Sequence, residues 1–533
     1  MSLQPLTLPA QSSQQEATLR QGRLSNGLTY YIRHNAAEPG LASFYLAQRV
    51  GSILEMPHQR GLAHFLEHMA FNGSTHFRGE GISPGLISWC ESVGIKFGTN
   101  LNACTGVDRT VYHISAAPVR RQGVVDSCLL ILRDWCDGLL LKEKAIDKER
   151  CVVREEWRTR RTGMAVARMM EDAFPVIFKG SKYEDAMPIG HLDVINNFSP
   201  DALRDYYNKW YRPDLQAVVV VGDVDVNVIE SQIKRQFGGL SLPPNAPQRR
   251  YYPVADNKRM ITHVMRDAEQ PIALAHLYMK RDVKLTSVRS SEHYQQEIYE
   301  HDLICLMLNE RLSKQQSGAK APFTAASVKD GKFLIVQTKK AFSLSVSCKR
   351  DQIEAGLSAA VGLLEQARQW GFTTGELTRA KAILRNKAER CNNQRGQLAN
   401  HHYVKQCLDH YLYGEPILST AEELHVRRKF DAELTLADVN TAIKELVTDR
   451  NQVLLLYAPK KADFRVPSTE QLERCVRGAQ KKSYPAYQEC VRPKMLLTAF
   501  PRPGKILAEY DHTKAGVRVF KLSNGIRLSV QIK

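Results

Sequence analysis

The segment His64-Phe65-Leu66-Glu67-His68 combines two histidines and a glutamate at a spacing that suits metal-assisted hydrolysis. Histidines four residues apart lie on one face of a helix, and two such imidazoles can hold one zinc ion. Glu67 lies one turn from His64, where its carboxylate can accept a proton from a zinc-bound water. This H-x-x-E-H order is the inverted form of the H-E-x-x-H motif. The alternative is an amphipathic helix whose two histidines are packed or exposed without a metal.

The residues around this segment favour the metal site. Apolar residues recur at helical spacing on one face, and Asn72-Gly73 is a helix-stop signal directly after the motif. The spacing therefore predicts a short, buried and sharply terminated helix. Its apolar face consists of Leu62, Phe65, Leu66, Met69 and Ala70.

A catalytic zinc needs a third protein ligand and keeps a fourth position open for water. The predicted helix over residues 147–158 offers three acids. Glu149 and Glu156 are seven residues apart on one face, which suits one direct ligand and one acid that orients a ligating histidine. Glu155 points about 100° away from Glu156, and spacing does not choose between them. Each acid could equally lie on a solvated face and pair with Arg150, Arg154 or Arg158.

A structural zinc without an open position is another interpretation. It would need a fourth protein ligand, and the nearest candidates in the sequence are Cys104 and His113. No spacing argument supports either residue.

Composition indicates a globular protein of more than one domain. The 533 residues are 43% hydrophobic and 24% charged, with a net charge of +18. This charge fits a solvated basic surface, or attraction to acidic peptides or anionic cell-surface material. Nucleic-acid binding is not indicated, because basic runs interleaved with aromatic residues are missing. The 11 cysteines form no C-x-x-C pair and are interpreted as mostly buried free thiols.

Targeting signals are not evident. No apolar run is long enough to span a membrane, and the N-terminus lacks the basic start and apolar core of a signal peptide. We expect that a signal peptide has been removed and that Met1-Ser2-Leu3 now precedes the mature sequence.

The chain repeats one pattern of elements. Ser199 and Thr435, 236 residues apart, each open a predicted helix that leads into a buried apolar strand. Leu24-Ser25-Asn26-Gly27-Leu28 also returns as Leu522-Ser523-Asn524-Gly525-Ile526. We therefore expect an α+β fold with a repeated domain of about 230 residues. The predicted divisions are a disordered lead-in (1–20), a catalytic zinc-binding domain (21–240), a linker (241–255), a second domain without a metal site (256–500), and a linker with the first strand of a truncated third domain (501–533).

Apolar periodicity predicts the elements within each domain. The first domain has strands over 27–33, 41–50 and 217–221, an extended region over 97–115, and helices over 118–137, 142–165 and 200–210, with a Pro/Gly-rich loop after 165. The second has strands over 261–266, 271–280, 323–330 and 332–348, and helices over 291–314, 350–369 and 374–410.

With these motifs in place, the chain resembles the M16 (pitrilysin/insulinase-type) metallopeptidases, which include mitochondrial processing peptidase. The segments that carry the resemblance are Gly61–Gly73, Phe97–Ala103, Glu149–Arg158, and Trp210–Asp214 with the valine run after it. It is most similar to bacterial cell-envelope members. The resemblance implies tandem domains, each a mostly antiparallel sheet packed with helices, as in LuxS and mitochondrial processing peptidase.

The resemblance also implies roles for individual residues. It gives the distal zinc ligand as Glu156, the supporting acid as Glu149 and the general base as Glu67, with one zinc ion per chain. Glu156 follows His68 by 88 residues, longer than in the best-known members, and we place the excess in a loop at Arg78–Gly85. The family binds substrate as an added strand along a sheet edge. The matching residues here are Asn102, Ala103, Cys104 and Thr105.

The function implied is a zinc endopeptidase for extended peptides or unfolded polypeptides. The alternative is a non-catalytic binding subunit, although such relatives tend to lose the motif. Family members enclose peptides between two halves, the second of which supplies an Arg and a Tyr. We therefore expect this chain to be an N-terminal half that is weakly active alone and is completed by a missing half, a partner chain or a dimer. The expected location is the bacterial periplasm or cell envelope, with the cytoplasm as the alternative.

Overall fold

The structure is a computed structural model that describes residues 19–80, 83–163, 165–318, 320–489, 501, 503–512 and 516–531. Most of the predicted lead-in lies outside these residues. The chain forms two compact units, Met1–Tyr487 and Gln488–Lys533, each of which is considered by itself. No helix in the described part of the chain is long and apolar enough to cross a membrane.

The first unit contains a six-stranded sheet at its N-terminal end, in the order β1-β2-β6-β3-β5-β4. β2 and β6 are parallel, and the other neighbours are antiparallel. β6 is buried along its whole length, as its run of four valines predicts for a central strand. The strands are β1 (Arg20–Arg23), β2 (Thr29–His34), β3 (Leu41–Gln48), β4 (Leu101–Thr105), β5 (Thr110–Pro118) and β6 (Gln216–Gly222).

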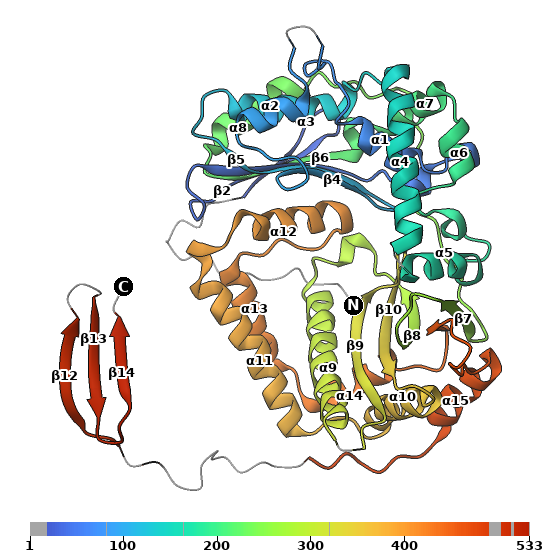
Figure 1. The fold of residues 1–533 in the computed structure, drawn as a ribbon, viewed down its shortest axis with the longest axis vertical. Helices are drawn as coiled ribbons and strands as arrows, with labels where there is room; N and C mark the ends of the chain where they lie inside the picture. Colours follow the sequence, from blue (N-terminus) through green and yellow to red (C-terminus); the bar gives the residue numbers. More distant parts are fainter. Residues whose placement is uncertain are drawn as a thin grey trace. The chain divides into compact units, whose positions relative to one another are not determined.

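Helices cover both faces of this sheet (Figure 1). The helices of the first domain pack on one face in the larger apolar core. The other face, with Tyr31 and Val219, packs against Tyr403 and Cys407 of α12 (Asn400–Tyr413), which comes from the second half of the chain. The first-domain helices are α1 (Leu62–Met69), α2 (Leu86–Ser92), α3 (Val124–Asp137), α4 (Glu143–Gly163), α5 (Ala165–Ile177), α6 (Leu192–Asn197), α7 (Pro200–Trp210) and α8 (Val226–Phe237).

A second sheet repeats this topology. Its order, β7-β11-β8-β10-β9, matches β2-β6-β3-β5-β4, and the first pair, β7 and β11, is again the parallel one. Ser199 and Thr435 cap α7 and α14, which lead into β6 and β11. The predicted repeat of mostly antiparallel α+β domains is therefore confirmed. The strands are β7 (Ile261–Asp267), β8 (Ala273–Asp282), β9 (Phe323–Lys332), β10 (Lys339–Cys348) and β11 (Gln452–Pro459), and the helices are α9 (Glu292–Gln316), α10 (Ile353–Trp370), α11 (Thr374–Asn393), α13 (Thr420–Glu433), α14 (Leu436–Leu446) and α15 (Thr469–Lys481).

Two predicted elements were wrong. The helix expected over 374–410 is divided into α11 and α12 by a 3-10 turn at Arg395–Gln397, where Gly396 interrupts the helical run. The loop expected after 165 contains α5, whose residues Met169, Ala173 and Ile177 recur every fourth position and are buried.

The segment 241–255, predicted as a linker, is partly packed into the first unit. The Arg249 guanidinium is 4% exposed and lies 2.9 Å from the equally buried Asp108 carboxylate. Val254 is also buried. The two sheets are therefore joined by a fixed connection rather than by a free tether.

The second unit forms a three-stranded antiparallel sheet from β12 (Ile506–His512), β13 (Val517–Leu522) and β14 (Arg527–Gln531). The prediction of a single first strand over 501–533 is therefore corrected. The repeated Leu-Ser-Asn-Gly sequence is the turn of a hairpin in both places. Leu24 donates to Leu28 O (2.8 Å) between β1 and β2, and Leu522 donates to Ile526 O (2.9 Å) between β13 and β14.

Candidate metal centre and peptide-binding edge

The motif helix α1 begins at a position that is set by close contacts around its N-terminus. Its first cap residue, Gly61, has a φ of 104°, and the side chain of Glu55 is completely buried beneath it. The Glu55 carboxyl accepts hydrogen bonds from the backbone N–H of Gly61 (3.1 Å) and of Ala63 (2.7 Å). These two donors belong to the set that a helix leaves unpaired at its first turn. Burial raises the pKa of Glu55 to about 8, against the opposing effect of these two bonds and of Arg60.

A glycine pair completes this N-terminal packing. The backbone of Gly190 lies so close to Gly61 that a Cβ built on Gly190 would meet the Gly61 Cα at 2.3 Å and the Arg60 carbonyl at 2.5 Å. Gly190 also has a φ of +67°, a conformation that L side chains rarely adopt. Only glycine fits here, so this contact fixes the position at which α1 begins.

α1 and α4 bring two histidines and one glutamate together. The ligand atoms of His64, His68 and Glu156 all lie within 4.8 Å of one another. His64 Nε2 is 3.6 Å from Glu156 Oε1, and His68 Nε2 is 3.1 Å from Glu156 Oε2. No other described residues form a group of three possible metal ligands.

The three donors fit a tetrahedral zinc site. Bonds of 2.0–2.1 Å to nitrogen and oxygen place neighbouring ligand atoms about 3.3 Å apart, and the two observed distances lie on either side of this value. Two imidazole nitrogens and one carboxylate oxygen are also a donor set that zinc takes in catalytic sites. The side chains of His68 and Glu156 are 21% and 27% exposed, so the group is reachable from solvent.

Glu149, which is predicted as the supporting acid, contacts the second nitrogen of His68. Its Oε1 lies 2.8 Å from His68 Nδ1, and its Oε2 accepts a hydrogen bond of 2.8 Å from Asn72. Burial acts to lower the pKa of His68, but its hydrogen bonds with Glu149 and Glu156 raise that pKa to about 9. Burial and the neighbouring His68 lower the pKa of His64 to about 4. The hydrogen bond from His68 holds the pKa of Glu156 at about 2.

Glu67 is directed to the end of β4. Its side chain is buried, and this burial raises its pKa, while the hydroxyl and backbone N–H of Thr105 act in the opposite direction. A carboxylate with a raised pKa is a better proton acceptor than an ordinary one. The sequence-predicted base and the predicted peptide-binding residue therefore lie side by side.

β4 is an edge strand, with β5 as its only neighbour in the sheet. The backbone N–H of Ala103 bonds to the Asn102 side chain (2.8 Å) rather than to β5, so it faces the open edge. Because strand residues alternate in direction, Leu101 and Thr105 face the same way. The N–H and C=O of Leu101 are occupied by Lys96 O and Gly98 N, and the N–H of Thr105 bonds to Glu67, which leaves Ala103 for an added strand.

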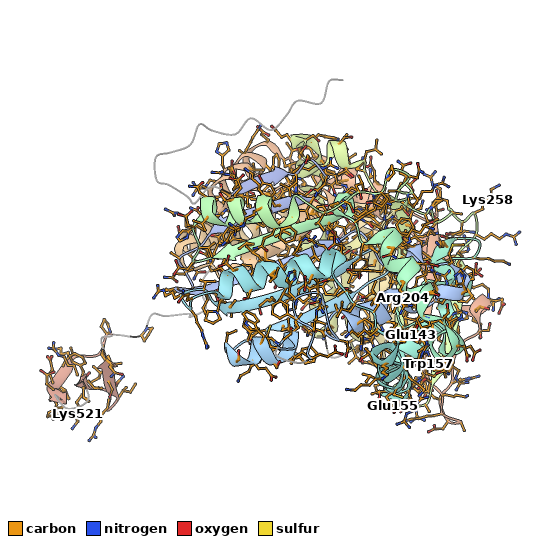
Figure 2. The ribbon with its side chains drawn as sticks, turned by 90° about the horizontal axis from the view of Figure 1, so that it is seen from above. Glu143, Glu155, Trp157, Arg204, Lys258 and Lys521 are labelled. Atoms are coloured by element: carbon orange, nitrogen blue, oxygen red, sulfur yellow. The ribbon has the colours of Figure 1, made fainter. Side chains whose placement is uncertain are left out.

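Several predicted alternatives are not brought to the site. His113 and Cys104 lie on the sheet face away from α1, with His113 stacked on Tyr45, so neither can be a fourth ligand. Glu155 lies at the outer surface of α4 and pairs with Arg158 at 2.8 Å (Figure 2). Arg150 instead donates to the carbonyls of Ile195 and Phe198, at 2.7 Å each.

Sequence reasoning missed three supporting side chains. Arg160 lies 2.5 Å from Glu156 Oε1, and its position four residues after Glu156 could have revealed it. Asn72 was interpreted only as a helix stop. Glu55 gives no recognisable sequence signal, because the turns between it and α1 bring it to Gly61 and Ala63 at a spacing that follows no helix or strand period.

Comparisons with known proteins agree with this geometry. Residues 38–174 match the family model described as "Insulinase (Peptidase family M16)", and residues 197–384 match "Peptidase M16 inactive domain". Together the two matches cover more than half of the chain. The chain belongs to peptidase family M16. Its candidate ligands His64, His68 and Glu156, and the candidate base Glu67, all fall within the first match.

Individual relatives are similar along most of the chain. A protein of Arabidopsis thaliana named "Zinc protease PQQL-like" is 26% identical over 508 residues, which are 95% of this chain and 49% of the relative. "Probable zinc protease PqqL" of Escherichia coli is 26% identical over 436 residues, 81% of this chain and 45% of the relative. The chain thus spans about half the length of these curated relatives.

A solved structure shares the fold. The periplasmic protease PqqL from Escherichia coli superimposes with a TM-score of 0.80 at 24% sequence identity, over 98% of this chain and 56% of that one. At this identity the likeness concerns the fold alone, which is the M16 fold of repeated domains.

The glycine contact at α1 can be tested with Gly190→Ala. The new methyl group would meet the backbone at Gly61, so we expect a loss of stability about 1–3 kcal/mol greater than the strain of alanine at positive φ. Gly180→Ala is the matched control, because Gly180 has a similar φ of +77° with nothing within 4 Å of its Cβ position. Urea unfolding measures both; equal losses would contradict the contact.

The buried Glu55 predicts a pH-dependent stability that Glu55→Gln removes. With its pKa raised from 4.5 to about 8 on folding, the folded protein binds this proton more tightly than the unfolded chain. Its stabilising contribution is therefore present below pH 4.5 and is lost as the pH rises through about 8. We expect the free energy of unfolding of the wild type to fall relative to Glu55→Gln across this range. A pH-independent difference in urea unfolding would refute it.

Proposed function

We propose that this chain carries the zinc centre of a metallopeptidase that hydrolyses extended peptides or unfolded polypeptides. The observation that carries the proposal is the position of Glu67, between the His64–His68–Glu156 group and the open edge of β4. A metal site, a buried proton acceptor and a strand-binding edge are the parts that peptide hydrolysis needs at one place. Membership of family M16 and the zinc-protease names of the relatives support it.

His64, His68 and Glu156 would hold the metal. Zinc, when bound, supplies a Lewis acid that polarises the scissile carbonyl and lowers the pKa of water to near 7. Glu67 accepts the proton of the attacking water at its carboxylate and then delivers it to the leaving amine. Its buried position, which raises its pKa, suits both halves of this transfer.

Two further side chains hold the ligands in place. Glu149 accepts the Nδ1–H of His68, which fixes the tautomer and leaves Nε2 free to bind. Arg160 binds Glu156 Oε1, so that Oε2 is the oxygen left for the metal. Such outer contacts typically change metal affinity by about 10–100-fold when removed.

The substrate would add to β4 as a further strand. The N–H and C=O of Ala103 would pair with the peptide backbone, which gives affinity for extended chains with little dependence on sequence. The N–H of Thr105 stays with the Glu67 carboxylate. Asn102 covers the Ala103 N–H in the free protein and would have to release it on binding.

The length of the chain suggests that the substrate enclosure has a further component. Because it spans about half the length of the curated relatives, we propose that a further polypeptide segment or a partner chain completes the substrate enclosure. Similarity to a periplasmic protease supports a periplasmic or cell-envelope location. A non-catalytic binding subunit is the competing function, and the absence of chelator-sensitive cleavage of an unstructured peptide by zinc-loaded protein would favour it.

Zinc content tests the third ligand. Glu156→Gln should lower bound zinc from about one per chain to near zero under dialysis, because an amide is a poor replacement for the carboxylate ligand. Glu155→Gln, one residue away on the same helix, should keep full zinc, because Glu155 pairs with Arg158 instead. Elemental analysis measures both variants. Equal zinc content would remove Glu156 from the ligand set.

Turnover tests the proton acceptor. Glu67→Gln should retain zinc but lower kcat on an unstructured peptide by about 10²–10⁴-fold, since an amide cannot accept the proton. Chelation should abolish the activity of the wild type, and added zinc should restore it. Wild-type turnover in the Glu67→Gln variant would exclude Glu67 from catalysis.

The strand edge is tested at Ala103. Ala103→Pro removes the outward N–H without removing a bond to β5, and proline is tolerated at such edge positions. We expect kcat/KM to fall about threefold to tenfold through KM, the effect of one lost hydrogen bond. Ala103→Ser keeps the N–H and is the matched control. A lower zinc content in Ala103→Pro would point to distortion of the site instead.

A further inference from the structure

The side-chain amide of Asn72 has a fixed orientation beside the metal centre. Its Nδ2 donates to Glu149 Oε2 (2.8 Å) and to the backbone carbonyl of His68 (3.1 Å). Both partners can only accept, so the nitrogen rather than the oxygen of the amide must face them. Asn72 therefore acts at this place as a donor alone.

This donor divides the two oxygens of Glu149 between separate tasks. Oε1 accepts from His68 Nδ1 and Oε2 accepts from Asn72, each at 2.8 Å. A carboxylate held at both oxygens cannot rotate about its last bond without losing one of them. Glu149 of α4 thus links two residues at the end of α1. It holds the His68 ring through one oxygen and is itself held by Asn72 through the other.

We infer that Asn72 is a positioning residue that sets the His68 imidazole, and hence metal affinity, through Glu149. The inference rests on the proposed zinc function. It differs from a role as a helix stop, because Gly73, at a φ of +119°, already ends the helical conformation. A helix stop needs no contact with Glu149.

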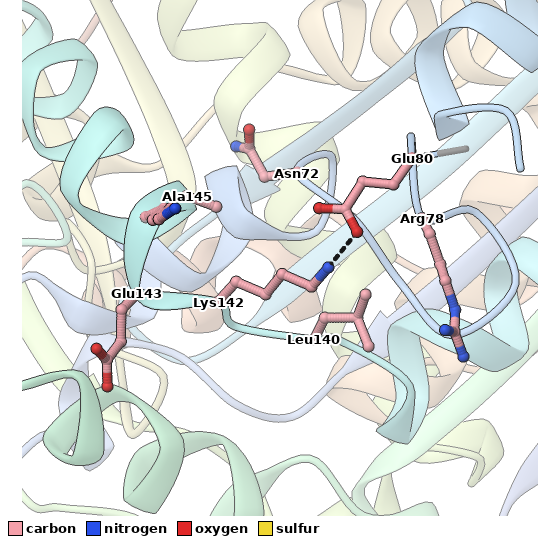
Figure 3. Close-up of a pocket in the computed structure, with 8 residues that line it drawn as sticks. Asn72, Arg78, Glu80, Leu140, Lys142, Glu143 and Ala145 are labelled. Atoms are coloured by element: carbon pink, nitrogen blue, oxygen red, sulfur yellow. Dashed lines mark hydrogen bonds and ion pairs between the residues drawn. The ribbon is translucent and has the colours of Figure 1, made fainter.

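The surroundings of Asn72 allow it to be changed without rebuilding the core. It lines an open cavity of about 360 Å³ together with Lys142 and Glu80, which pair at 2.6 Å (Figure 3). A side chain of the same size can occupy this position with no new packing.

Asn72→Asp is the decisive substitution, because it keeps the shape and removes the donor. The new carboxylate would face two acceptors, so we expect zinc affinity to fall about tenfold or more. Asn72→Ala, which removes the donor without adding charge, should lose less. Asn197→Asp is the matched control, since the Asn197 amide donates to a single backbone carbonyl, of Asp193, at an exposed site.

A polarity exchange separates positioning from structure. In Glu149→Gln, the amide can still accept from His68 while its NH₂ group faces position 72. The carboxylate that Asn72→Asp introduces would accept from this NH₂ group, so adding Asn72→Asp to Glu149→Gln should leave zinc affinity unchanged or raise it. A structural role predicts the same loss in both backgrounds, and additive losses would overturn the inference.

A spectroscopic signal gives a second readout that does not depend on activity. In the Co²⁺-loaded full chain, we expect the paramagnetic ion to shift the imidazole N–H protons of His64 and His68 away from other signals. The His68 proton, identified by its response to Glu149→Gln, should exchange faster with solvent in Asn72→Asp, while the His64 proton serves as the internal reference. Identical exchange in wild type and Asn72→Asp would overturn the inference.

Metal binding by the wild-type chain distinguishes a failure of the proposed function from a failure of the role of Asn72. If the wild-type chain binds neither zinc nor Co²⁺, the proposed function fails. If it binds both and Asn72→Asp has wild-type zinc affinity, only the role of Asn72 fails.

Discussion

The arrangement of the site depends on His68, whose two ring nitrogens both meet carboxylates of α4. Nδ1 lies 2.8 Å from Glu149 and Nε2 lies 3.1 Å from Glu156, so a single ring fixes the angle and register of α1 against α4. The seven-residue spacing of the two acids is what allows one ring to lie between them. The packing of Gly61 on Gly190 and the hydrogen bonds of Glu55 fix the other end of α1. The two ends together leave little freedom in where His64 and Glu67 point.

The two repeats differ where the site requires it. Between β3 and β4 the first repeat forms the short helices α1 and α2, whereas between β8 and β9 the second forms the long helix α9. Asn309 of α9 bonds to both the N–H and the C=O of Val328 on β9, at 2.8 and 3.0 Å. This contact closes the edge of β9 at its centre. In β4 only the adjacent Asn102 covers Ala103, so this edge can accept a strand without displacing an element.

Local signals explain what could be predicted. The helix over 200–210 and the strand over 217–221 were predicted closely. Ser199-Pro200 is a helix start signal, and a run of valines is typical of a buried central strand. The choice of Glu156 over Glu155 came from family resemblance, since a helix alone does not say which face meets α1. Arg249 gave no pattern to detect, because its partner Asp108 lies far away along the chain. Glu55 bonds to Gly61 and Ala63 nearby, but at a spacing that follows no helix or strand period. The division of α11 from α12 has a local signal in Gly396, but the packing of α12 on the first sheet could not be predicted from the sequence.

The second repeat contributes to the site although it carries no ligand among the described residues. The turn after β4 is held by the buried Asp108, which binds Arg249 at 2.9 Å and accepts from Tyr183 at 2.8 Å. The Tyr183 hydroxyl in turn accepts from the backbone N–H of Gln337, next to β10. A buried carboxylate of this kind is stable only while its partners stay in place. The turn that follows the open edge of β4 is therefore held from both repeats, and the first domain by itself would lack the bonds of Arg249 to Asp108 and of Gln337 to Tyr183.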